Sequence, residues 1–223
     1  MAAGSTSLWD WDYAFSIIPD LLRALLTTIE ITVLGSAVAF VLGLVIAVVR
    51  RARIPVVDQV LWALVEVIRS TPLLVQIFFL FFVLPRFGLT LSAFVVGVTA
   101  LGVHYATYTS EVYRAGIDAV PKGQWEAATA LSLPRSRVWT GVILPQAIPR
   151  VLPALGNYAI SMFKEVPLLL AIGVVEVVNA GRELGSETFR FTEPYTIAGV
   201  LFLVLSYPAS MLVRRLERRA AVR

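Results

Sequence analysis

The chain has 223 residues, of which 58% are hydrophobic and 15% are charged, and its mean hydropathy is +0.80. Soluble domains are about 45–50% apolar and about 25% charged, so this composition excludes an ordinary soluble protein and a disordered chain, and it indicates an integral membrane protein. The net charge of +4 reports membrane topology in such a protein, so we expect no nucleic-acid partner. The chain contains no cysteine and one histidine, which excludes disulfides and multi-histidine metal sites within the chain.

The first 20 residues are predicted to form an extracytoplasmic N-terminal segment. They contain Asp10, Asp12 and Asp20 before any long apolar run, which is the wrong charge for the start of a cleaved signal peptide. Four aromatic residues share the segment: Trp9, Trp11, Tyr13 and Phe15. Aromatic side chains of this kind gather at membrane–water interfaces, so we expect this segment at the outer surface.

Five apolar stretches are long enough to cross a bilayer, which needs about 20 residues of helix. They run from Leu21 to Val49, Val57 to Leu84, Leu89 to Tyr113, Val151 to Val178, and Tyr195 to Val213. None shows the alternation of period two that is typical of barrel strands. The sequence therefore predicts an all-α polytopic membrane protein with five transmembrane helices over 21–213, in which the longer stretches tilt.

Basic residues predict the orientation. They form three groups: Arg50, Arg51 and Arg53; Arg114, Lys122, Arg135, Arg137 and Arg150; and Arg214, Arg215, Arg218, Arg219 and Arg223. Five spans and an outside N-terminus place all three groups in the cytoplasm, as the positive-inside rule requires. We therefore expect an N-out/C-in topology, with 214–223 as a basic cytoplasmic tail.

The segment 114–150 is the only long hydrophilic interruption. Residues 125–133 are expected to form a short helix that ends at Pro134, and residues 135–144 a second short piece that Pro145 stops. The shared face of the first piece would carry Trp125, Ala128, Thr129 and Leu131. Such short helices lie on a membrane or dock in a groove of another protein, and a solvated basic loop is the alternative.

Within that segment, the run GQWEAATALSLPRSRVWTGVILPQA at 123–147 resembles the cytoplasmic EAA loop of ABC importer permeases. The family pattern is Glu-Ala-Ala, three residues, Gly, nine residues, an aliphatic residue, one more residue and Leu-Pro. Ser132 stands where the family has Gly. A residue other than glycine at positive φ costs about 1 kcal/mol, so either Ser132 bears this cost or the turn differs.

Three further segments resemble the polar amino-acid uptake subfamily of these permeases, the histidine, glutamine and arginine type. They are IRSTPLLVQ at 68–76, EVYRAGI at 111–117 and FKEVPLLLAI at 163–172. The resemblance implies the type I ABC importer permease (MetI-like) fold in a bacterial cell membrane. The runs WDWDYAFSIIPDLL and HYATYTSEVYRAGIDAVPKGQWEAATAL are more narrowly similar to permeases of ectoine/hydroxyectoine importers.

The chain lacks the G-x-x-x-x-G-K-[ST] phosphate loop, so we expect no ATP hydrolysis by the chain itself and no catalytic residue, cofactor or metal. The resemblance implies a separate pair of cytoplasmic ATPase subunits that bind ATP and dock on the EAA loop. The candidate coupling residues are Gln124, Glu126, Ala127, Ala128, Ser132 and Leu133. The alternative for the two alanines is that they are only good helix formers.

Polar and aromatic residues inside the spans form the candidate solute path. They are Gln76, His104, Tyr105, Tyr108, Glu111, Asn157, Tyr158 and Ser161. His104, Tyr108 and Glu111 recur at i, i+4 and i+7, so we expect them on one helical face. Such a surface suits a small zwitterion, and hydrogen bonding between helices is the alternative.

Charged residues within the spans need partners, because a charge at the bilayer centre costs about 2.5–3.5 kcal/mol. Glu66 and Arg69 have the i, i+3 spacing of a helical ion pair, as do Glu111 and Arg114 near a span end. Lys164 and Glu165 are adjacent, so they are expected to face different partners near a helix break at Pro167.

Taken with the resemblance, these features predict a permease subunit that imports polar amino acids or their derivatives by alternating access. The implied partners are an ATPase dimer, a second permease, an extracytoplasmic solute-binding protein and membrane lipid. A heterodimer of permeases is favoured and a homodimer stays open. The alternative is an ion-coupled secondary transporter for a small zwitterion, which the lack of an evident internal repeat disfavours.

Overall fold

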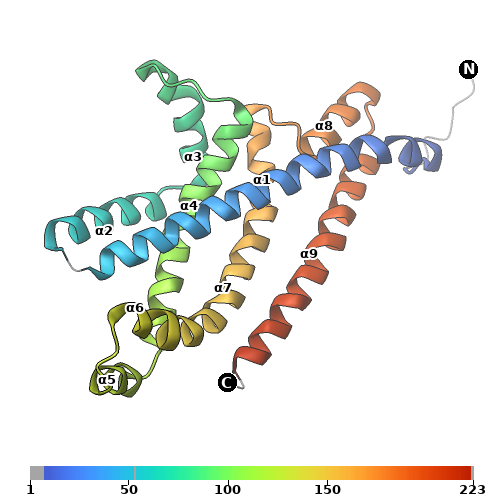
Figure 1. Ribbon diagram of the computed structural model, residues 1–223. Coiled ribbons are helices and arrows are strands. Elements are labelled where there is room, and N and C mark those ends of the chain that lie inside the picture. The colour runs from blue at the N-terminus through green and yellow to red at the C-terminus, as the bar shows by residue number, and fades with distance from the viewer. Residues whose placement is uncertain (1–7, 53, 222–223) are drawn as a thin grey trace, which may run out of the picture.

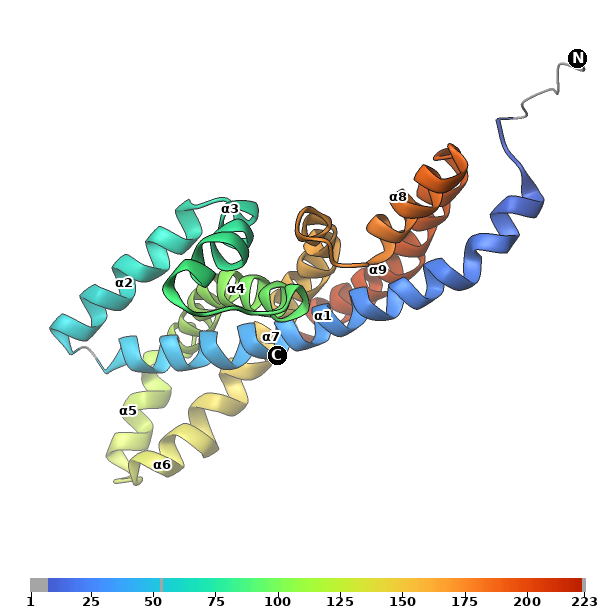
Figure 2. The ribbon, with the colours of Figure 1, turned by 90° about the horizontal axis from the view of Figure 1, so that it is seen from above.

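The structure is a computed structural model that describes residues 8–52 and 54–221, and every regular element in these two ranges is a helix (Figures 1 and 2). The predicted all-α class is therefore confirmed. Residues 1–7 of the expected N-terminal segment, Arg53 of the first basic group and residues 222–223 of the tail lie outside the described residues.

Helix α1 (Trp11–Arg51) is the longest element, with 41 residues. It begins at Trp11 rather than at Leu21, because the Asp10 carboxylate accepts hydrogen bonds from the backbone N–H groups of Asp12 and Tyr13 and caps the first turn. A helix of this length extends about 60 Å, twice the thickness of a hydrocarbon core. In Figure 2, α1 runs along the length of the molecule.

The second expected span is not one straight helix. Helix α2 (Pro55–Ser70) is followed by α3 (Leu73–Phe78), whose π and 3₁₀ extensions η1 (Phe79–Val83) and η2 (Leu84–Phe87) continue to Phe87. The helical path bends by 105° between the two parts. Pro72 disfavours helical geometry in the preceding residue, and Thr71 is extended with φ −103° and ψ 133°. The expectation of one continuous crossing over 57–84 is therefore corrected to a sharp corner.

Helix α4 (Ala93–Asp118) is the centre of the bundle and makes its most extensive contact with α1. Glycine permits this close approach. A Cβ atom on Gly43 would lie 2.1 Å from Thr109 Oγ1, and one on Gly102 would lie 2.6 Å from Val38 Cγ1. The core beside this crossing includes Ile31, Leu101 and other buried residues of α3, α7 and η4.

The polar interruption forms α5 (Lys122–Ala130), α6 (Arg135–Arg137) and the π-helical η3 (Val138–Ile143). The prediction that Pro145 stops the second piece is wrong, since η3 runs directly into α7 (Leu144–Glu165). Pro145 lies in the first turn of α7, where the missing N–H of proline is tolerated.

Helix α7 continues as the 3₁₀ helix η4 (Val166–Ile172), in which Pro167 lies in the first turn, and this run ends at Gly173 with φ +79°. The chain then forms α8 (Val177–Thr188), which is capped by the fully buried Glu176. Helix α9 (Thr192–Ala221) completes the chain.

Within residues 8–52 and 54–221, three helical runs are long and apolar enough to cross a membrane: α1, Arg135–Ile172 and Thr192–Arg219. The bent pair of α2 with α3 raises this number to four if it counts as one crossing. Helix α4 has the length of a span at 26 residues but carries several polar and aromatic side chains. The expected number of five spans is therefore not confirmed.

Candidate functional site

An aromatic cluster lies where α4 faces α7 and α3. The ring centroids of Tyr108 and Tyr158 are 5.7 Å apart, those of Tyr105 and Tyr158 are 5.9 Å apart, and those of His104 and Tyr108 are 5.3 Å apart. His104 and Tyr105 are buried, whereas Tyr108 and Tyr158 are half-buried. Four residues of the expected solute path therefore meet in one place.

Gln76 reaches this cluster from α3 and also holds the α2–α3 corner. Its Nε2 atom donates to the carbonyl oxygens of Ile68 at 2.7 Å and Thr71 at 2.9 Å, on the two sides of the end of α2. Its Oε1 atom lies 3.2 Å from His104 Nδ1. The Gln76 side chain thus links the corner to α4.

Two charged residues flank the cluster, and the sequence interpretation did not include either of them in the solute path. The Glu165 carboxylate, at the end of α7, lies beside the Tyr105 hydroxyl. Among the described residues, no group donates a hydrogen bond to its buried Oε2 atom. The guanidinium of Arg69 lies over the ring of Tyr108, with Cζ 5.2 Å from the centroid. An adjacent Lys-Glu pair within an apolar run was the sequence signal for Glu165.

The expected ion pairing of these residues is only partly observed. Lys164 and Glu165 do face different surroundings, since Lys164 lines a cavity of about 400 Å³ beside Phe202 and Leu203 of α9. No ion pair joins Glu66 to Arg69 within the described ranges, and Arg69 contacts Tyr108 instead.

Of the remaining members of the expected path, Glu111 and Asn157 contact charged residues outside the aromatic cluster, and Ser161 is exposed. Glu111 accepts from Arg50 Nη1 at 2.8 Å and from Arg114 Nη1 at 3.0 Å, so the expected Glu111–Arg114 pair is confirmed and Arg50 joins it. Asn157 is exposed and donates to Glu217 Oε1 of α9 at 3.1 Å. Ser161 is exposed on α7.

Helix α5 carries four of the six expected coupling residues, and three of these lie on its exposed side. Gln124, Glu126 and Ala127 are exposed, whereas Ala128 is 3% exposed and packs inward. Trp125 also faces inward and joins Trp139 against Ile117 and other members of a small apolar core. Leu131 does not share this inward face, because 72% of its surface is exposed. The face that the sequence predicted for Trp125, Ala128, Thr129 and Leu131 is therefore only partly observed, since Trp125 and Ala128 pack inward whereas Thr129 and Leu131 are exposed.

Ser132, which stands at the family's glycine position, lies in the turn after α5. Ser132 has φ +51°, so it adopts the left-handed conformation and bears the cost. The Ser132 N–H donates to Thr129 O at 2.9 Å and the Leu133 N–H donates to Ala128 O at 3.1 Å, which is the hydrogen-bond pattern of a Schellman motif. A cavity of about 500 Å³ lies beside this turn, and its lining includes Trp125, Ser132, Leu133 and Trp139.

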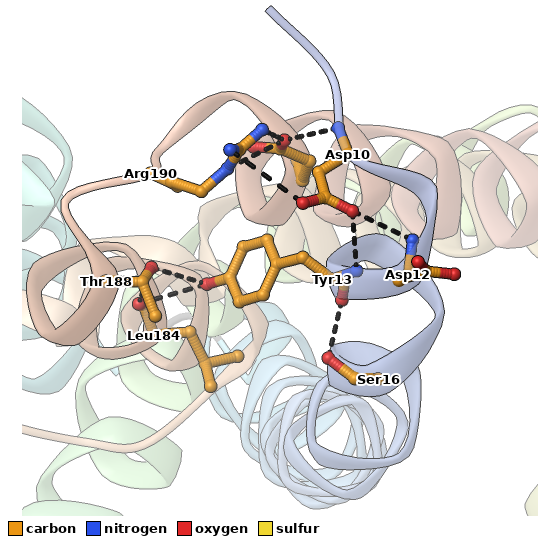
Figure 3. Close-up of polar contacts among 8 residues, drawn as sticks. Asp10, Asp12, Tyr13, Ser16, Leu184, Thr188 and Arg190 are labelled. Atoms are coloured by element: carbon orange, nitrogen blue, oxygen red, sulfur yellow. Dashed lines mark hydrogen bonds and ion pairs between the residues drawn. The ribbon is translucent and has the colours of Figure 1, made fainter. Parts of the chain in front are cut away.

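A separate polar cluster fastens the opposite end of α1 (Figure 3). The Tyr13 hydroxyl donates to Leu184 O at 3.1 Å and accepts from Thr188 Oγ1 at 2.9 Å. The Asp10 N–H donates to Glu193 Oε1 at 2.9 Å, and Arg190 donates to the same carboxylate. This hydrogen bond raises the pKa of Arg190 above its ordinary value, so the guanidinium stays charged. We call these residues the N-terminal clasp.

Comparison with known proteins accounts for this architecture. Residues 16–222 match the family described as "Binding-protein-dependent transport system inner membrane component". The chain is 50% identical to the "Probable amino-acid ABC transporter permease protein y4tG" of Sinorhizobium fredii, over 91% of this chain and 87% of that protein. It is 34% identical to the "Glutamine transport system permease protein GlnP" of Escherichia coli, over 96% of this chain and 99% of that protein.

Solved structures agree with these relatives. One is described as an amino acid ABC transporter with histidines; it has a TM-score of 0.87 and 36% identity, covering 95% of this chain and 99% of that chain. The methionine ABC transporter MetNI shares the fold, with a TM-score of 0.77 and 21% identity over 92% of this chain and 98% of that chain. The chain therefore belongs to the family of inner membrane components of binding-protein-dependent transport systems, the permease subunits of ABC importers.

Proposed function

We propose that this amino-acid ABC permease moves a zwitterionic polar amino acid, or a derivative of one, past the aromatic cluster of α4 and α7. The observation that carries the proposal is the buried Glu165 Oε2 atom without a donor among the described residues. Buried carboxylate oxygens almost always have a partner, and a solute ammonium or amidinium group would supply it. Tyr105, Tyr108 and Tyr158 offer ring faces that favour the same cation.

The charges around the cluster match the two ends of such a solute. Glu165 lies at the Tyr105 side, and the exposed Arg69 lies over Tyr108. A solute carboxylate near Arg69 and a solute cation near Glu165 would leave no unpaired charge. Relatives described for glutamine and arginine transport support this class, and ectoine, which combines a carboxylate with an amidinium, fits the same pattern.

The energy for import would come from outside the chain. In this proposal, a cytoplasmic ATPase dimer binds ATP and docks on the exposed face of α5 through Gln124, Glu126 and Ala127. A second permease, different from this one, would complete the path, and a solute-binding protein would deliver the solute. The chain itself would have no enzymatic activity and bind no cofactor.

The topology that this scheme needs is N-out/C-in. Figure 1 supports it, because α5, α6 and the C-terminal end of α9 lie at one end of the molecule and the N-terminal end of α1 lies with α8 at the other. The first end would be cytoplasmic. It carries Arg50, Arg51, Arg135, Arg137 and Arg150, which is the side that the positive-inside rule assigns to basic residues.

Uptake by proteoliposomes that contain the permeases, the ATPase and the binding protein tests the solute path. We expect Glu165→Gln to lower uptake about tenfold, because a charge-assisted hydrogen bond to the solute is lost. Labelled glutamine, arginine, histidine and ectoine are compared. Lys164→Gln is the matched control, since Lys164 is the next residue along the chain and its side chain faces α9 instead of the cluster. Wild-type uptake by Glu165→Gln would contradict the path.

The coupling face has its own test. We expect Glu126→Lys to reduce copurification of the ATPase and solute-stimulated hydrolysis at least tenfold, because the introduced ammonium would face the basic group of the ATPase with which we expect Glu126 to pair. Glu183→Lys, at the opposite end of the molecule, is the control. Uptake that needs no ATPase and follows an ion gradient would instead establish the secondary transporter.

A further inference from the structure

Arg51, the last residue of α1, contacts both halves of the loop that contains α5. Its Nη1 atom lies 2.7 Å from Asp118 Oδ1 at the end of α4. Its Cζ atom lies 5.2 Å from the ring centroid of Trp125 on α5 and 5.6 Å from that of Trp139 on η3. One side chain thus joins α1 to three other helical elements.

The two tryptophans form a preformed seat for this guanidinium. Their rings are 5.4 Å apart in an edge-to-face arrangement with an interplanar angle of 84°. Ile117, Val120 and Ile143 support them from α4, the following turn and η3. An arginine over an aromatic ring gains from its planar, delocalised charge, and the Asp118 carboxylate fixes its orientation. The contact is therefore directional as well as attractive.

The neighbouring arginine shows that this arrangement is specific to Arg51. The Arg50 side chain turns to other partners, with Nε 3.0 Å from Asp58 Oδ1 and Nη1 2.8 Å from Glu111 Oε1. It binds α1 to α2 and to Glu111 of α4 rather than to α5. Helix α5 itself packs against η3 rather than along α1. Arg51 is therefore the side chain of α1 that reaches the two tryptophans.

We infer that Arg51 is the positioning residue that transmits a displacement of α5 to α1 during transport. When the ATPase moves α5, Trp125 and Trp139 move the guanidinium, and α1 follows. Helix α1 then acts on α4, which carries His104, Tyr105 and Tyr108 of the aromatic cluster. This inference rests on the proposed role of α5 in coupling.

The test measures solute imported per ATP hydrolysed in proteoliposomes with the whole transporter. We expect Arg51→Met, which keeps the aliphatic part of the side chain, to lower this ratio about fivefold while solute-stimulated hydrolysis continues, because both cation–π contacts are lost. Arg51→Lys keeps the charge and should restore at least half of the ratio. Arg23→Met is the matched control, because Arg23 is exposed and pairs only with Asp20 among the described residues.

Assembly is measured in parallel by copurification of the ATPase and by the melting temperature of the complex. A wild-type ratio in Arg51→Met would overturn the inference. Equal losses of assembly, hydrolysis and uptake, without recovery in Arg51→Lys, would also overturn it, since they would show a purely structural role. Failure of the proposed function gives a different result, in which wild-type uptake does not depend on ATP hydrolysis at all.

Discussion

The two ends of α1 are both fastened by arginines and carboxylates, but in different ways. At the N-terminal clasp, Glu193 is 1% exposed and accepts hydrogen bonds from the Asp10 backbone as well as from Arg190. At the other end, the side chains of Arg51 and Asp118 are 34% and 62% exposed, and the remaining contacts of Arg51 are with ring faces. A buried carboxylate tied to backbone resists displacement, whereas an exposed ion pair holds its end of α1 less firmly and lets that end follow the two tryptophans. The difference indicates a fixed end and a movable end.

The comparison requires that α1 is held rigidly against α4 between its two ends, and Gly43→Val tests this requirement with the largest expected effect. A Cβ atom there would clash with Thr109 Oγ1, whose hydroxyl donates to Ala39 O at 2.8 Å. We expect a loss of about 3 kcal/mol of stability, measured as membrane yield and melting temperature in detergent. Gly199→Ala on α9 is the control, because its added Cβ would meet no atom within 4 Å. An unchanged melting temperature in Gly43→Val would show that α1 and α4 do not cross rigidly.

Glu193→Ala breaks the fixed end and should have the next largest effect. The Asp10 N–H loses its Glu193 acceptor and Arg190 loses one of its partners, so we expect the melting temperature to fall by about 5 °C while solute imported per ATP stays unchanged. Glu187→Ala, which removes an exposed carboxylate from α8, is the control. A drop in the transport ratio as large as that of Arg51→Met would mean that both ends move, and the distinction would be lost.

Ser132→Gly tests the strained turn after α5, near the movable end of α1, and has the smallest expected effect. Glycine adopts φ +51° without steric strain, so we expect about 1 kcal/mol of added stability and a melting temperature higher by about 2–4 °C, with uptake unchanged. Ser136→Gly should do the opposite, since Ser136 has helical geometry in α6 and glycine weakens a helix. A lower melting temperature in Ser132→Gly would contradict the assigned strain.

The sequence predicted the helical class, the short helix at α5 and its unusual serine, because these depend on local composition and spacing. It did not predict the 105° corner at Thr71, although Pro72 was visible, since the apolar run continues through it. Nor did it predict that η3 continues into α7 at Pro145. A proline ends a helix when it lies in the interior but is tolerated in the first turn, and the sequence did not show where α7 begins.

The candidate site was predicted in part. The face shared by His104 and Tyr108 follows from helical spacing, and the structure brings it to Tyr158. Glu165 and Arg51 were not included, because their importance depends on partners far away in the chain: Tyr105, and the pair Trp125 and Trp139. Asn157 precedes Tyr158 on α7, but its side chain points to α9. Helical spacing would have indicated this difference, because adjacent residues of a helix face different directions.

The length of α1 has a consequence for the size of the motion that transport needs. Pivoting a rod of about 60 Å by about 5° around its midpoint shifts each tip by about 3 Å, close to the width of a water molecule. With its outer tip held by Glu193, the pivot would shift toward that tip and nearly double the excursion at Arg51. A tilt of α1 by a few degrees is thus enough to open or close a passage of the width of a water molecule, while the packing of α1 on α4 stays intact.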